Sequence, residues 1–263
     1  MSRQSRVRLT IVAATILVIV VVFAVAGWMF SLAGNMQSSR RLDKVSADMP
    51  PAQPVAVADI DVNGPGRTAN ELTEWSQPIA AQTDISGQAL RAYANAELIA
   101  RDAWPECHLS WNTLAGIGWV ETRHGTYNGN WFKPSELNDN GEAIPHIVGI
   151  KLDGSSGTAD TPDTDDGEFD GDPEHDRAVG PMQFIPESWG RYGLDADGDG
   201  KPNPHQIDDA ALSAAKLLCA DGRDLTKKKD WRRAIFAYNQ SEEYLRRVAL
   251  AANSYAQGQP ATS

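Results

Sequence analysis

The stretch Leu114-Ala-Gly-Ile-Gly-Trp-Val-Glu121-Thr-Arg-His-Gly125 decides which fold we expect. Its apolar residues recur at helical spacing, and Ser110 and Gly125 are residue types that begin and end helices. On this helix Glu121 lies seven residues after Leu114, on the same face. A carboxylate on an apolar face loses hydration, which raises its pKa and lets it act as an acid near neutral pH. The alternative is a solvated glutamate near a helix end.

Three further stretches follow along the chain: Gly180-Pro-Met-Gln-Phe-Ile-Pro186, Asp195-Ala-Asp-Gly-Asp-Gly200 and Ala237-Tyr-Asn-Gln-Ser-Glu-Glu-Tyr244. Together with V-E-T-R-x-G around Glu121, they resemble in sequence and order the motifs of lytic transglycosylases of the membrane-bound lytic murein transglycosylase B family. The resemblance covers residues 86–257. It implies a mostly α, lysozyme-like transglycosylase domain with a substrate cleft and an EF-hand-like metal loop.

The resemblance also implies an activity. Such enzymes cleave the β-1,4 bond between N-acetylmuramic acid and N-acetylglucosamine in peptidoglycan. Glu121 would protonate the glycosidic oxygen, the substrate's acetamido group would stabilise the cationic centre, and Glu121 would then take the proton of the C6 hydroxyl. The product is a 1,6-anhydromuramoyl end. Most glycosidases instead need a second carboxylate, and no clear one accompanies Glu121 in the sequence.

Four residues are expected along the saccharide cleft from the same resemblance: Gln183, Tyr238, Asn239 and Tyr244. Without the family resemblance, the Gln183 amide would be expected to bond to local backbone. Tyr244 would be expected to pack in the core with its hydroxyl at the surface. Many relatives carry a tyrosine where this chain has Leu217. A saccharide contact from that position is therefore not expected.

The acidic stretch begins like an EF-hand loop, with carboxylates at positions 1, 3 and 5 and glycine at position 6. Position 12 is Gln206, which lacks the bidentate carboxylate. The family resembles an EF-hand with a longer loop, which Asp209 would close, with Asp208 as the adjacent competitor. The alternative is a polar turn without metal. We expect a structural Ca²⁺, or another cation, held by Asp195, Asp197, Asp199, the Lys201 carbonyl and Asp209. No cofactor is expected for the chemistry.

The two cysteines, Cys107 and Cys219, are too few for a disulfide-built scaffold, and no Cys/His spacing suggests zinc. In an exported protein such a pair is expected to form a disulfide. Two buried thiols are the alternative.

The N-terminus indicates the compartment. Arg3, Arg6 and Arg8 precede an uncharged run, residues 9–34, which exceeds the ~20 residues that span a bilayer. We favour an uncleaved anchor that holds the C-terminal domain outside the cytoplasm, facing the cell wall. A signal peptide cleaved after Ala24-Val-Ala26 is the alternative, and it would make the protein secreted.

The expected organisation is a short cytoplasmic segment (1–8), an anchor or signal (9–34), a flexible linker (35–83), the lytic transglycosylase domain (84–257) and a tail (258–263). The linker lacks sustained periodicity and is rich in proline and glycine. Helices are expected at 86–103, 185–192, 208–220 and 231–256, the last broken near Asn239, with a short strand within 144–152. Ten carboxylates between Asp153 and Asp176 predict a solvated loop, with a second calcium site as the lesser alternative.

The formal net charge of −11 argues against a nucleic-acid partner or an anionic membrane surface. Peptidoglycan strands are the expected partner, and a monomer is the expected state. Two other functions stay open: a muramidase that hydrolyses the same bond, and a non-catalytic, calcium-dependent cell-wall-binding module. The Glu121 stretch argues against the module, which gains nothing from an acid on an apolar helix.

Overall fold

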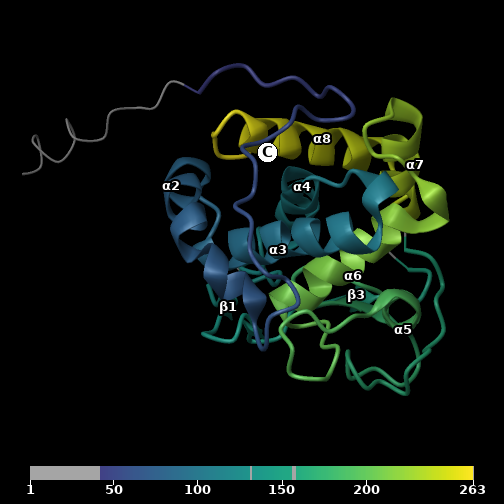
Figure 1. Cartoon of the computed structure of the whole chain (residues 1–263). Coiled ribbons are helices and arrows are strands. Elements are labelled where there is room, and N and C mark those ends of the chain that lie inside the picture. Colours follow the sequence, from purple (N-terminus) through teal and green to yellow (C-terminus); the bar gives the residue numbers. More distant parts are fainter. Residues whose placement is uncertain (1–41, 131, 156–157, 263) are drawn as a thin grey trace, which may run out of the picture. The chain divides into compact units, whose positions relative to one another are not determined.

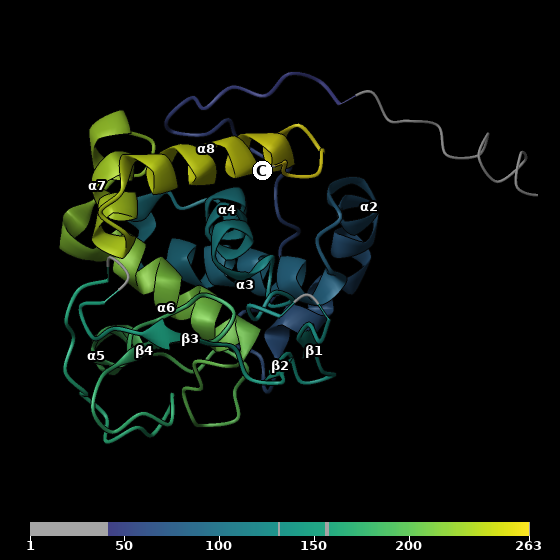
Figure 2. The ribbon, with the colours of Figure 1, turned by 180° about the vertical axis from the view of Figure 1, so that it is seen from behind.

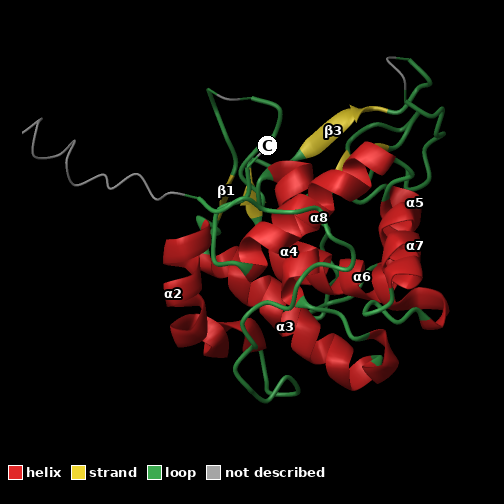
Figure 3. Cartoon of the chain, turned by 90° about the horizontal axis from the view of Figure 1, so that it is seen from above, coloured by secondary structure: helices red, strands yellow, loops and turns green. Residues whose placement is uncertain are grey.

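The structure, a computed structural model, describes residues 42–130, 132–155 and 158–262. The chain divides into two units, Met1–Asp43 and Lys44–Ser263, and every described helix and strand belongs to the second. This unit is mostly helical, as predicted (Figure 3). None of the helices described is long and apolar enough to cross a membrane. The segments expected at 1–8 and 9–34 lie outside the described residues.

Helix α4 (Trp111–Thr122) is the centre of the unit and carries Glu121 in its last turn. It lies between α3 (Gly87–Ala103) and α8 (Glu242–Ala256), as Figures 1 and 2 show. Every residue from Trp111 to Gly118 is buried, so the helix is enclosed on all sides for two turns. At Gly116 a Cβ would lie 2.8 Å from the Val248 carbonyl oxygen, so this glycine permits the close approach of α8.

The ends of α4 differ from the expectation. Ser110 occupies the N-cap position, but its hydroxyl donates to the Gln53 side chain at 3.1 Å. The Glu97 carboxylate of α3 instead accepts the Trp111 N–H at 2.6 Å. At the other end Arg123 adopts the left-handed conformation (φ 53°), so the helix ends before Gly125. A partly buried carboxylate from a neighbouring helix thus caps α4 and fixes it to α3.

The remaining helices follow the sequence prediction closely. Ser86 caps α3 by accepting the Ala89 N–H. The final helical region is broken at Asn239, whose backbone is extended. The other elements are α5 (Pro186–Tyr192), α6 (Ile207–Cys219), α7 (Lys228–Tyr238) and the short 3-10 helices η2 (Pro105–Cys107) and η3 (Ala220–Gly222).

Two small antiparallel sheets lie at one side of the helices (Figure 3). Strand β1 (Glu136–Leu137) pairs with β2 (Ala143–Ile144), and β3 (Val148–Lys151) pairs with β4 (Arg177–Val179). The strand predicted within 144–152 is therefore present as β3. Strand β4 leads directly into the turn Gly180–Phe184, which Val179 and Phe184 close through two backbone hydrogen bonds of 2.8 and 3.0 Å.

The structure differs from the flexible linker expected at residues 35–83, because residues 44–83 pack on the folded unit. They include η1 (Thr68–Leu72) and α2 (Thr73–Thr83). Leu72 is fully buried and packs with Leu98 of α3. Arg67 forms an ion pair with the buried Asp208 at 2.7 Å. The proline and glycine content suggested a linker, but a few apolar side chains and one buried ion pair are enough to dock the segment.

The start of the C-terminal tail packs on the helical unit. The Gln259 N–H donates to the Ser254 carbonyl at 3.0 Å, and Ala261 is buried. The residues after α8 therefore fold back onto the core.

The expected disulfide is present and joins η2 to the end of α6. Cys107 and Cys219 have Cα atoms 5.3 Å apart and a sequence separation of 112. The bond therefore links η2, which precedes α4, to α6, the helix that follows the acidic loop.

The docked N-terminal segment yields a stability prediction. Leu72→Ala should lower the free energy of unfolding by about 2–5 kcal/mol, because it leaves a cavity against α3. Val55→Ala, at a side chain that is 55% exposed, should change it by less than about 0.5 kcal/mol. Urea denaturation of both variants measures this, and equal, small effects would restore the linker interpretation.

Candidate active site

The Glu121 side chain borders a cavity of about 210 Å³. The cavity also receives Gln183 from the turn after β4, and Tyr238 and Asn239 from the break between α7 and α8. Leu217 of α6 contributes an apolar part of the lining. Three of the four residues expected along the cleft therefore surround one space together with the expected acid.

The environment of Glu121 suits a group that must both give and accept a proton. Burial raises its pKa to about 7, while a hydrogen bond from Tyr244 and the positive charge of Arg247 oppose that rise. The Tyr244 hydroxyl donates to Glu121 Oε1 at 2.5 Å. Near neutral pH the carboxyl is thus divided between its acid and base forms, which is the condition general acid–base catalysis requires.

Tyr244 does not line the cavity, in contrast to the expectation for it. Its ring is buried, and it stacks on Tyr238 with a centroid distance of 6.5 Å. Its hydroxyl bonds to Glu121 instead of reaching the surface. The Tyr238 hydroxyl in turn donates to the Met182 carbonyl at 2.6 Å. Both phenols are therefore occupied, so Tyr244 positions the acid and Tyr238 presents its ring to the cavity.

Gln183 combines both roles considered for it. Its backbone is in the left-handed region (φ 50°), and its side-chain amide donates to the Gly180 carbonyl at 3.0 Å while lining the cavity. A Cβ on Gly180 would lie 1.7 Å from the Pro204 carbonyl oxygen. Only glycine therefore fits where this turn meets the segment after the acidic loop.

Two residues after Glu121 stabilise the site and were missed as functional residues. The Thr122 hydroxyl donates to the Pro181 carbonyl at 2.6 Å, which ties the end of α4 to the Gln183 turn. His124 is buried, and its ring nitrogens contact the hydroxyls of Tyr93 (3.1 Å) and Tyr255 (2.9 Å). Burial lowers its pKa to about 3, so it is neutral. Their positions beside the glutamate were the available signal, but only the fold supplies their partners.

The acidic loop brings three of the four expected carboxylates together. Oxygens of Asp195, Asp197 and Asp209 lie within 4.8 Å of one another. Burial raises the pKa of Asp209 to about 7, although it accepts N–H groups from Ala196 and Asn203. Asp199 is not part of this cluster, and its carboxylate accepts the Lys201 N–H. The donor set fits a hard, oxygen-preferring cation such as Ca²⁺.

The candidates for closing the loop have separate roles. Asp208 pairs with Arg67, whereas Asp209 faces the other two carboxylates. The Gln206 side chain accepts the N–H groups of Asp208 and Asp209, so it caps α6. This geometry agrees with Asp209 rather than Asp208 or Gln206 as the closing residue.

The loop of residues 153–176 is solvated, but ion pairs also hold it to the neighbouring strands. Asp172 pairs with Arg177 at 2.8 Å and with Lys151 at 3.3 Å, which joins the loop to the β3–β4 ladder. Asp163, Asp165 and Asp176 form a second group of carboxylates within 4.8 Å. Asp176 accepts hydrogen bonds from Thr164, so this group closes the loop internally.

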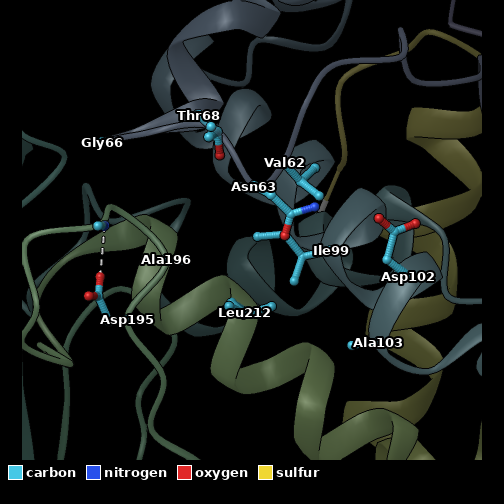
Figure 4. A pocket seen from close by; sticks show the side chains of 12 residues that line it. Val62, Asn63, Gly66, Thr68, Ile99, Asp102, Ala103, Asp195, Ala196 and Leu212 are labelled. Atoms are coloured by element: carbon cyan, nitrogen blue, oxygen red, sulfur yellow. Dashed lines mark hydrogen bonds between the residues drawn. The ribbon is translucent and has the colours of Figure 1, made fainter.

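A larger hollow, of about 480 Å³, lies away from Glu121 (Figure 4). Val62, Ile99 and Leu212 form its apolar part, and the carboxylates Asp102 and Asp195 stand at its edges. Its lining contains neither Glu121, whose pKa is raised, nor the amides of Gln183 and Asn239, which line the smaller cavity. Size alone therefore does not identify the site.

The raised pKa of Glu121 predicts a pH-dependent effect on stability. The folded state binds this proton more tightly than the unfolded chain, whose glutamate titrates near 4.5. The proton on Glu121 therefore stabilises the folded state below about pH 4.5, and this stabilisation is lost as the pH rises to about 7. The stability of Glu121→Gln relative to wild type should increase across this window and level off above it. Urea denaturation between pH 4 and 8 measures this, and a difference independent of pH would contradict the assignment.

Comparison with known proteins yields one family match. Residues 176–242 match the family model described as the transglycosylase SLT domain. The matched segment contains Gln183, the acidic loop and the pair Tyr238–Asn239, and it ends before Tyr244. No curated protein sequence is significantly similar to the chain.

The solved structure of the Escherichia coli lytic transglycosylase SLT35 in complex with bulgecin A is a distant structural neighbour. It aligns with 74% of this chain and 78% of that chain, at 15% identity and a TM-score of 0.37, which is too low to support an argument. The family match supports the enzyme class that the sequence predicts, a peptidoglycan lytic transglycosylase.

Proposed function

We propose that this chain cleaves the β-1,4 bond between N-acetylmuramic acid and N-acetylglucosamine in peptidoglycan and forms 1,6-anhydromuramoyl ends. One observation carries the proposal: among the described residues that line the cavity, Glu121 is the only carboxyl. Retaining and inverting glycosidases need two carboxyl groups about 5–9.5 Å apart. A lone carboxyl with a pKa near 7 instead suits a reaction in which one group acts as acid and then as base.

In this reaction Glu121 gives its proton to the glycosidic oxygen, and the leaving sugar departs. The substrate's acetamido oxygen stabilises the cationic C1. Glu121 then removes the proton of the C6 hydroxyl, whose oxygen bonds to C1. The hydrogen bond from Tyr244 stabilises the carboxylate that exists between the two transfers. The amides of Gln183 and Asn239 are the groups available to orient the sugar.

A hydrolytic muramidase and a non-catalytic wall-binding module remain the rival functions. The muramidase needs a base to activate water, and the described cavity lining offers no second carboxyl for it. The module needs no acid with a raised pKa. Both rivals are therefore less well supported by this site.

We also propose that residues 9–34 anchor the enzyme with its C-terminal unit outside the cytoplasm, or secrete it if they are cleaved. The folded unit begins at Lys44, only ten residues after Gly34. An anchored enzyme would act on strands at the outer face of the membrane. We propose that it acts as a monomer.

For the acidic loop we propose a structural Ca²⁺ bound through Asp195, Asp197 and Asp209, with Asp199 and the Lys201 carbonyl as further ligands. A cation would relieve the repulsion between the carboxylates, which contributes to the raised pKa of Asp197. The bound ion takes no part in the chemistry at Glu121.

The catalytic assignment is tested by Glu121→Gln. The amide is nearly isosteric but cannot exchange the proton, so the rate should fall by at least about 10²–10⁴. Mass spectrometry of digested peptidoglycan should find anhydromuramoyl ends with the wild type and almost none with the variant. Reducing ends would identify hydrolysis, and turnover by the variant would refute the role of Glu121.

The metal proposal is tested by melting curves with calcium and with chelator. Calcium should raise the melting temperature of the wild type, because a ligand bound only to the folded state stabilises it. Asp209→Asn should remove most of this shift. Gln206→Ala should lower stability through the lost α6 cap but keep the calcium shift. Equal shifts in the wild type and Asp209→Asn would exclude this ligand set.

A further inference from the structure

Two arginines stand beside Glu121 on the two helices that build its environment. Arg123 follows Glu121 by two residues at the C-terminus of α4. Arg247 lies one turn after Tyr244 on α8, and the bond from Tyr244 to Glu121 brings this face of α8 to the acid. Both arginines are half-buried. The contact between α4 and α8 therefore brings the Arg247 charge to Glu121, and Arg123 at the end of α4 interacts with Arg247.

Arg123 is held in place without an acidic partner. Its guanidinium lies 4.0 Å from the centre of the Trp119 ring and donates to the Trp119 carbonyl at 2.5 Å. Ring and carbonyl both attract a cation at a helix C-terminus. These contacts use the face of the guanidinium and one N–H of Nη1, so its other N–H groups can bind a ligand.

The two arginines interact electrostatically with each other and with the acid. Burial and, to a lesser extent, the positive charge of Arg247 lower the pKa of Arg123, and the same charge opposes the rise in the pKa of Glu121. Like charges held close together in a partly buried place are unfavourable unless an anion compensates them.

The charge of Arg247 acts on the acids Glu121 and Glu243, but neither forms an ion pair with it. Neither arginine forms an ion pair within the described ranges. The nearby Glu243 is bonded twice to Arg246, at 3.0 and 2.9 Å, and Glu121 accepts from Tyr244. In a chain with 35 acidic and 24 basic side chains, two such unpaired cations at one place indicate a ligand anion.

We propose that Arg123 and Arg247 form an anion subsite that binds a carboxylate of the glycan strand's lactyl or peptide side chain. This inference rests on the proposed function. A guanidinium matches a carboxylate through paired hydrogen bonds. The two arginines lie outside the lining of the 210 Å³ cavity, so they extend the site beyond the part that receives neutral sugar groups.

The subsite also couples substrate binding to the protonation of the acid. Arg247 favours the ionised form of Glu121 while its charge is uncompensated. A carboxylate bound to Arg247 cancels much of that effect, so the pKa of Glu121 rises. The acid therefore holds its proton more tightly when a charged strand is in place.

The experiment combines a change in the protein with a change in the substrate. Glycan strands are prepared with free carboxylates and, in a second batch, with these groups converted to carboxamides. Wild type, Arg247→Gln and Arg247→Lys are compared on both by KM and kcat. Arg246→Gln, the adjacent arginine paired with Glu243, is the matched control, and circular dichroism melting checks each fold.

We expect Arg247→Gln to raise KM about tenfold on carboxylate strands, the size of one lost charge-assisted contact. The loss should shrink below about threefold on amidated strands, because the partner is absent there. Arg247→Lys should recover part of the loss, and Arg246→Gln should follow the wild type on both substrates. Added salt should raise KM for the wild type more than for Arg247→Gln.

An equal loss on both strands would overturn the subsite, because the arginine would then act through structure alone. No loss on either strand would overturn it too. If the wild type released no anhydro product, the proposed function would fail first. Calorimetric binding of both strands to Glu121→Gln, with and without Arg247→Gln, would then still decide whether the pair selects carboxylates.

Discussion

The close contact of α8 with α4 at Gly116 is the constraint on which the site depends. A side chain there would strike the Val248 carbonyl, so glycine sets the distance between the two helices. At that distance the Tyr244 hydroxyl reaches Glu121, and the Tyr244 ring stacks on Tyr238 beside the cavity. A wider separation would leave Glu121 hydrated, and its pKa would return toward that of an ordinary glutamate.

Burial supplies the reactivity, and hydrogen bonding limits it. A carboxyl at the end of a buried helix, stripped of water without a donor, would stay protonated and could not serve as a base. The Tyr244 bond and the Arg247 charge favour the ionised form and keep the pKa near 7. The same loss of hydration destabilises the fold above pH 7, so the site retains its function at the expense of stability.

Much of the fold was predictable because its helices carry local signals. Ser86, Asn239 and the apolar stripe of α6 mark boundaries that the structure reproduces. The docking of residues 44–83 was not predictable, since it depends on Leu72 and Arg67 meeting partners far along the chain. The capping of α4 by Glu97 was not predictable for the same reason.

The candidate site residues also divide into those that local sequence indicates and those that depend on contacts between distant segments. Glu121, Gln183, Tyr238 and Asn239 were selected because the stretches that contain them resemble the motifs of a known family. The orientation of Tyr244 and the partners of His124 depend on contacts between helices. A sequence pattern identifies which residue types are present, but only packing determines which atoms they face.

The segment after the acidic loop lies against the Gln183 turn, so a cation bound in the loop, as proposed, could influence a site that it does not touch. The Gln183 turn meets the segment after the loop where Gly180 abuts the Pro204 carbonyl. Asp208 and Asp209 are neighbours at the start of α6, yet one holds Arg67 of the docked N-terminal segment and the other faces the loop. If the proposed cation binds the loop, it would hold in place the segment against which the Gln183 turn packs, and the proton transfers would remain with Glu121.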